Sequence, residues 1–221
     1  MVSAGMRARV RGLAEPVARG FGRLGLTPNH LTFIGFGIAC IAAVAAAQQA
    51  WLAAGLLVLF GGVFDLFDGA LARATNKVSK LGAFYDSVFD RWGEGVVYVG
   101  IAAGSANAGF REGPVLAAAA LASAVMVSYA RAKSEGLGFT TGTGMASVGL
   151  MPREVRLAVL TVGLLLAPVT LFEALPAGVA CGGPCDLQVG TLTLALAAIA
   201  IGATITTIQR ILHVRAQAQE D

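Results

Sequence analysis

The sequence predicts an all-α membrane protein in which six transmembrane helices follow an amphipathic helix at the membrane surface. Hydrophobic residues make up 56% of the 221 residues and charged residues 13%, whereas a soluble domain has about 25% charged residues. The mean hydropathy of +0.73 agrees with this bias. Six apolar runs approach the roughly 20 residues that a membrane crossing needs. They predict a single domain over residues 1–221 with a helical bundle at 30–212.

The N-terminal segment 6–24 has the pattern of a helix that lies on the membrane surface. Its apolar residues recur every three or four positions, while most of its arginines fall off that stripe. The stripe consists of Val10, Leu13, Val17, Phe21 and Leu24. No apolar run with a small-residue cleavage site follows directly, so we expect no removable signal peptide. A disordered basic tail is the alternative.

Short polar or glycine-rich segments separate the predicted spans. The spans cover residues 30–48, 51–74, 82–106, 115–135, 152–175 and 187–212. Residues 136–149 contain glycines, threonines and serines between two basic clusters, which indicates a loop that faces the substrate. The loop 176–186 contains Cys181 and Cys185, which either form a disulfide or remain two free thiols.

The basic residues indicate which side of the membrane each loop faces. Six spans place both termini on one side, and that side receives all of the sixteen Lys and Arg residues except Arg91 and Arg111. By the positive-inside rule the crowded side is cytoplasmic. Because these residues are scattered at the ends of apolar runs, we interpret them as topology signals and expect no nucleic-acid partner.

Four carboxylates stand at the junction of the second and third spans: Asp65, Asp68, Asp86 and Asp90. A charge at bilayer depth costs at least about 2.5 kcal/mol, so such residues indicate function. Spacings of three and four residues place each pair on one helix face. Two such faces form an oxygen-only cage, which favours hard divalent cations such as Mg²⁺, Mn²⁺ or Ca²⁺ over zinc.

The aspartates have two alternative interpretations. Buried ion pairs with Arg73 and Arg91 would leave two of the four aspartates without a partner. A divalent-cation channel or carrier explains the acids but gives no role to Arg73 or to the basic clusters. Gly69 permits a close approach to the backbone, and Arg73 offers a guanidinium fork that fits a phosphate.

The acidic stretch resembles the signature of the CDP-alcohol phosphotransferase family, D-x2-D-G-x2-A-R-x8-G-x3-D-x3-D. It agrees at all eight fixed positions between Asp65 and Asp90. The resemblance implies transfer of a substituted phosphoryl group from a CDP-linked lipid to an acceptor hydroxyl, with release of CMP. It also implies the predicted six-span layout and a homodimer.

The resemblance further implies a role for individual residues. Asp65, Asp68, Asp86 and Asp90 would hold one or two ions of Mg²⁺ or Mn²⁺, and Asp90 would act as the general base. The residues expected to seat the CDP moiety are Asn29, Thr32, Asp68, Gly69, Ala72 and Arg73. Asn29 and Thr32 belong to a segment, T-P-N-x2-T, similar to one that family members keep near the nucleotide.

Two basic segments, 129–135 and 149–157, resemble the branch of this family that uses inositol phosphate as its acceptor. The residues expected to bind the acceptor's phosphate are Arg131, Lys133, Arg153, Arg156 and Arg210, because a dianion requires several cationic donors. Pro152 and Val155 depart from the pattern of that branch. Glycerol phosphate or serine therefore remain alternative acceptors, and anchoring at the cytoplasmic face remains an alternative role for these basic residues.

Overall fold

A computed structural model describes most of the predicted bundle. It describes residues 20, 22–23, 25–74, 79–108, 112–139, 145, 148–167 and 187–219, without the side chains of 66, 68–70, 73–74 and 187–189. The predicted surface helix 6–24 lies almost entirely outside the described residues. The loop with Cys181 and Cys185 also lies outside them, so both predictions stay untested.

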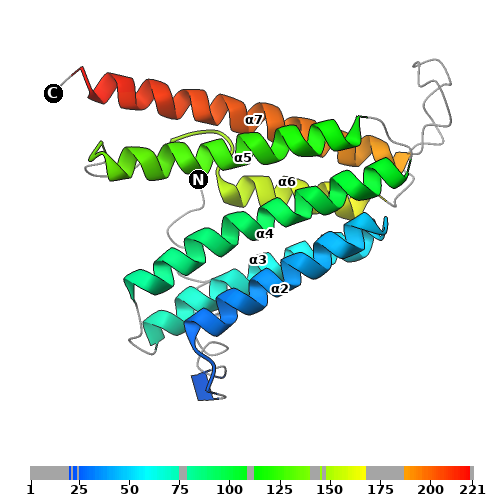
Figure 1. Ribbon diagram of the computed structural model, residues 1–221, viewed down its shortest axis with the longest axis horizontal. Coiled ribbons are helices and arrows are strands. Elements are labelled where there is room, and N and C mark those ends of the chain that lie inside the picture. The colour runs from blue at the N-terminus through cyan, green and yellow to red at the C-terminus, as the bar shows by residue number, and fades with distance from the viewer. Residues whose placement is uncertain are drawn as a thin grey trace.

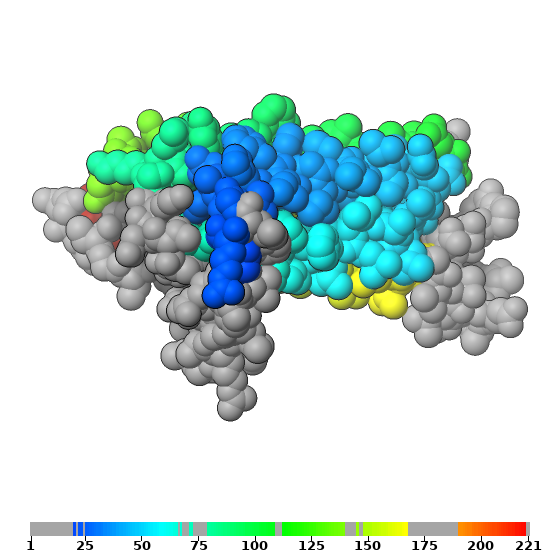
Figure 2. All heavy atoms as spheres, turned by 90° about the horizontal axis from the view of Figure 1, so that it is seen from below, coloured from blue at the N-terminus to red at the C-terminus, as the bar shows by residue number. Residues whose placement is uncertain are grey.

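Six helices account for most of the described residues (Figure 1), and their packing contacts close into a ring. They are α2 (Pro28–Ala47), α3 (Trp51–Ala74), α4 (Lys80–Asn107), α5 (Gly113–Gly136), α6 (Arg153–Leu166) and α7 (Leu187–Gln217). Each helix packs mainly against two others, in the circular order α2, α4, α5, α7, α6, α3 and back to α2. Figure 2 shows α2 and α3 side by side along one face. In this order α4 and α6 stand on opposite sides of the ring.

The helix boundaries agree with the sequence at most positions. The prediction of 51–74 matches α3 at both ends. Thr27 caps α2 by accepting a hydrogen bond from the His30 amide, and Ser79 caps α4 by accepting one from the Gly82 amide at 3.0 Å. The last helix is longer than the predicted span, because α7 continues past 212 to Gln217. The predicted end of the fifth span at 175 lies outside the described residues.

Three of the described helices are long and apolar enough to cross a membrane. They are α2, α5 and α7 from Gly190 onward. Among the described side chains of α3, Trp51–Asp65 forms a shorter apolar helix, and α4 carries Asp86, Asp90, Arg91 and Glu94 in its first half. Length and composition therefore support three of the six predicted crossings.

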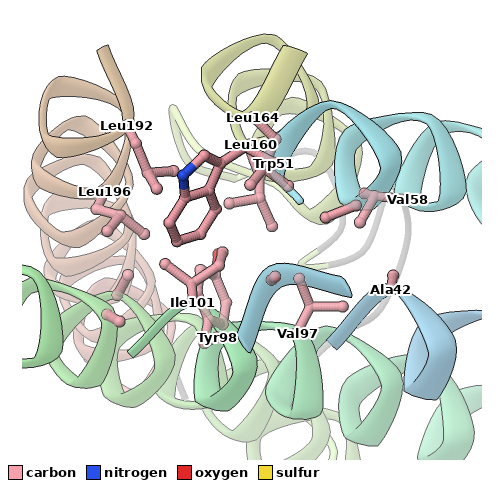
Figure 3. Packing of buried hydrophobic residues seen from close by; sticks show 14 of the residues in the cluster. Ala42, Trp51, Val58, Val97, Tyr98, Ile101, Leu160, Leu164, Leu192 and Leu196 are labelled. Atoms are coloured by element: carbon pink, nitrogen blue, oxygen red, sulfur yellow. The ribbon is translucent and has the colours of Figure 1, made fainter. Parts of the chain in front are cut away.

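The apolar core lies on the inner side of the ring. Figure 3 shows Trp51 with its indole directed toward Leu192 and Leu196 of α7 and toward Tyr98 and Ile101 of α4. Glycines bring α4 close to α2, because a Cβ at Gly100 or Gly104 would overlap the backbone of Ala43 or Ala46. Asp65 follows Trp51 by fourteen residues, which is about 21 Å along a helix. The carboxylates thus lie well away from the indole, toward the other end of the bundle.

Candidate active site

Three of the four predicted aspartates come together in the structure. Asp65 extends from α3, and Asp86 and Asp90 extend from α4 one turn apart. One carboxylate oxygen of each lies within 4.8 Å of the others. Both helices pack against α2, and this shared neighbour holds the two acidic faces near each other. The side chain of Asp68 lies outside the described part of the chain.

The three carboxylates fit a hard divalent cation. Their donor atoms are oxygens only, which is the ligand type that Mg²⁺ and Mn²⁺ prefer, and all three side chains are partly exposed and can be reached by an ion. The alternative of ion pairing with Arg91 is weak. Arg91 lies 3.6 Å from Asp90 Oδ2 and donates a shorter hydrogen bond, 2.8 Å, to the Ser87 carbonyl.

Arg153, in the first turn of α6, is the basic residue closest to this cluster among the described side chains. Its Nη1 lies 2.6 Å from Asp65 Oδ2 and 3.0 Å from Asp90 Oδ2. The sequence indicated Arg153 as an acceptor residue but gave no sign that it reaches the aspartates. The contact places a guanidinium group beside the candidate metal ligands. An incoming phosphate can accept charge-assisted hydrogen bonds from it there.

A second charged cluster, which sequence reasoning missed, lies one turn deeper on α4. Glu94 accepts two hydrogen bonds of 2.8 Å from Arg156, one from Nε and one from Nη2. The Tyr98 hydroxyl donates to the same carboxylate at 3.3 Å. Glu94 is 7% exposed and Arg156 is 1% exposed. The four-residue step from Asp90 to Glu94 was the available signal, because it places both acids on one face of α4.

The remaining basic residues predicted for the acceptor differ in exposure. Arg131 pairs with Glu135 of its own helix at 2.8 Å, with both side chains 42% exposed, and Lys133 is exposed. Arg210 is only 3% exposed and donates to the carbonyl oxygens of Val148 and Val127. Arg156 and Arg210 therefore have protein partners, whereas Arg131 and Lys133 face outward at the end of α5.

The segment predicted to lie near the nucleotide forms the start of α2. Asn29 Oδ1 would stand 3.3 Å from a Cβ at position 82, so Gly82 leaves room for it at the start of α4. Thr32 is buried and lines a cavity. Ala72 is partly buried on α3. The side chains of Asp68 and Arg73, and the surroundings of Gly69, lie outside what the structure describes.

A cavity of about 60 Å³ extends from the carboxylates into the bundle. Its charged lining residues are Asp65, Asp90, Glu94 and Arg153, and apolar residues of α2, α3, α4 and α6 complete its walls. Phe36 and Leu157 belong to these walls. The cavity therefore combines charged and hydrocarbon surface.

Carboxylates that can hold a divalent ion, an adjacent arginine and an apolar helical bundle together define a class of membrane-associated enzymes that act on phosphate groups. Within that class, the chain belongs to the CDP-alcohol phosphatidyltransferase family, whose model matches residues 25–215. It is a transferase, and the alternative of a cation carrier is set aside on this finding.

Two of the relatives carry names from one branch of the family. The chain is 35% identical over 174 residues to archaetidylinositol phosphate synthase of Pyrococcus horikoshii, covering 79% of this chain and 85% of that protein. It is 32% identical over 207 residues to phosphatidylinositol phosphate synthase of Cutibacterium acnes, covering 91% of each.

Solved structures show the same fold. Phosphatidylinositol phosphate synthase of Mycobacterium tuberculosis in complex with manganese and citrate superposes with a TM-score of 0.75 at 26% identity, over 91% of this chain and 88% of that one. The same enzyme with CDP-DAG bound gives a TM-score of 0.73 at 26% identity, over 91% and 92%.

Proposed function

We propose that this protein transfers the phosphatidyl group of a CDP-linked lipid, either CDP-diacylglycerol or an ether-lipid analogue, to a hydroxyl of inositol phosphate and releases CMP. The observation that carries the proposal is the convergence of three aspartates with Arg153, a basic residue from the segment that resembles the inositol phosphate branch. The names of the relatives and the CDP-DAG-bound structural neighbour support the same acceptor and donor.

The chemistry is a displacement at the lipid-linked phosphorus. The acceptor hydroxyl oxygen forms the new P–O bond, the P–O bond to CMP breaks, and Asp90 accepts the hydroxyl proton. Asp65, Asp68, Asp86 and Asp90 would hold Mg²⁺ or Mn²⁺, as the manganese complex of the structural neighbour supports. Such ions neutralise charge on the diphosphate and on the departing CMP.

The other predicted site residues bind either the CDP-lipid donor or the acceptor. Asn29, Thr32, Gly69, Ala72 and Arg73 seat the CDP moiety. Arg153, supported by Arg131 and Lys133, binds the acceptor's phosphate through charge-assisted hydrogen bonds. For Arg156 and Arg210, burial and protein partners favour a supporting role in place of direct contact with the acceptor.

The location of the protein is part of this proposal. We place six spans in the cell membrane, with the carboxylates and both termini on the cytoplasmic side, because the basic residues concentrate there and inositol phosphate is a polar substrate. A homodimer is the expected assembly. Membrane lipids then supply the donor laterally, and the acceptor enters from the aqueous side.

A CMP-release assay tests the proposal. Purified protein is mixed with a CDP-lipid, Mg²⁺ or Mn²⁺ and, in separate reactions, inositol phosphate, glycerol phosphate or serine. We expect CMP with inositol phosphate and no CMP after the divalent ions are chelated. CMP with glycerol phosphate or serine alone would contradict the acceptor, and the absence of CMP with every acceptor would contradict the transfer reaction.

A further inference from the structure

The five residues that lead into α6, residues 148–152, are held from two sides. The Met151 amide donates to Thr206 Oγ1 of α7 at 2.8 Å, and the Met151 carbonyl accepts from Arg156 Nη1 at 3.3 Å. Gly149 has φ +120, and a Cβ there would overlap the Thr206 side chain. The backbone directly before Arg153 is therefore fixed, which limits where the Arg153 side chain can reach.

The ion pair between Arg156 and Glu94 joins two helices that stand on opposite sides of the ring. α4 and α6 are not main packing partners among the described helices, so the pair crosses the interior instead of reinforcing an existing helix contact. Both guanidinium bonds measure 2.8 Å, and Tyr98, which has no exposed surface, donates to the same carboxylate.

Two pairs of opposite charge match along these helices in the same order. Arg153 of α6 contacts Asp90 of α4, and Arg156 of α6 contacts Glu94 of α4. The two arginines are three residues apart and the two acids are four residues apart. One turn of α6 is thus aligned with one turn of α4. The buried pair fixes the depth and rotation of α6, and the partly exposed pair then lies at the carboxylate cluster.

Energetics favour a geometric role for the buried pair. Replacing a buried ion pair by apolar residues of similar volume is often neutral or stabilising, because desolvation offsets the attraction between the charges. A bidentate pair does, however, define the distance and orientation of the two chains that carry it. Its benefit here is the placement of α6.

We propose that Glu94 and Arg156 are positioning residues that place Arg153 for the acceptor's phosphate, and that they control acceptor binding without contacting the acceptor. This inference rests on the proposed function, because it explains what positions Arg153 in the acceptor site of that proposal. Arg153 also contacts Asp65 of α3. A shift of α6 would therefore change how the Arg153 guanidinium is shared between the carboxylates and an incoming phosphate.

The test compares the kinetics of three variants with those of the wild type. Arg156→Lys keeps the charge and loses the bidentate geometry, Glu94→Gln keeps the volume, and the double variant Glu94→Leu with Arg156→Met removes both charges. In folded variants we expect the KM for inositol phosphate to rise about tenfold or more, since small misplacements have large effects. The KM for the CDP-lipid should change less than twofold.

The controls are Arg215→Lys and Glu112→Gln, which make the same substitutions at exposed positions and should leave every parameter unchanged. A wild-type KM for inositol phosphate in any folded variant overturns the inference. If none of the three variants folds, the pair is purely structural and the inference is again overturned. Failure of the proposed function is distinguishable, because the wild-type protein itself would then release no CMP with inositol phosphate.

Discussion

Arg153 and Arg156 lie one turn apart on α6 and both contact acids of α4, yet their surroundings differ. The Arg153 side chain is 24% exposed and is shared between two carboxylates of the candidate metal site. The Arg156 side chain is 1% exposed, and Glu94 is its acidic partner among the described residues. A partly exposed guanidinium can exchange its partner for a phosphate, whereas a buried one would leave an unpaired charge behind. The same residue type thus serves binding in one position and placement in the other.

The largest effect is expected at the carboxylates. Asp90→Asn removes the proposed base and one metal ligand, so CMP release should fall by about 10²- to 10⁴-fold while the protein stays monodisperse in detergent. Asp65→Asn should also reduce Mn²⁺ affinity in calorimetry. Activity near the wild-type level in Asp90→Asn would remove Asp90 from the reaction.

The two arginines should then differ in stability. Arg156→Met leaves Glu94 buried without its charge partner, and we expect a loss of about 3–5 kcal/mol, measured by reversible unfolding in mixed micelles. Arg153→Met, at a partly exposed pair, should cost about 1 kcal/mol or less. Equal losses for the two variants would contradict the distinction between them.

Arg153 should show the opposite pattern in binding. Arg153→Gln removes charge-assisted hydrogen bonds of about 1.5–3 kcal/mol, so the KM for inositol phosphate should rise about ten- to a hundredfold. Because a positive charge next to Asp65 and Asp90 disfavours a cation, the same variant should bind Mn²⁺ more tightly. Weaker Mn²⁺ binding in Arg153→Gln would contradict this electrostatic relation.

The smallest effect is expected at the end of α5. Arg131 and Glu135 form an exposed pair four residues apart, and such pairs contribute about 0.3–0.5 kcal/mol. Arg131→Gln should therefore leave the free energy of unfolding nearly unchanged and raise the KM for inositol phosphate by only a few-fold. An effect as large as that of Arg153→Gln would make Arg131 the principal acceptor residue.

The sequence predicted the helices and the aspartates because both are set by local spacing. Apolar runs placed α3 at its observed ends, and the four-residue step placed Asp86 and Asp90 on one face of α4. The resemblance over residues 65–90 then indicated the family, which the match over residues 25–215 confirms.

The arrangement of the arginines could not be predicted in this way. Arg156 and Glu94 are separated by 62 residues, and no periodicity links residues that far apart. All five basic residues looked alike in the sequence, since burial depends on how the ring closes. Only the closed ring separates Arg153, at the edge of the carboxylates, from Arg156, inside it.

The most direct test of this distinction is a structure of the protein with Mn²⁺ and inositol phosphate bound. We predict that the acceptor's phosphate accepts hydrogen bonds from Arg153, that the aspartates hold the ion, and that Arg156 keeps both of its bonds to Glu94. A phosphate held by Arg156, with the Glu94 pair broken, would contradict the account.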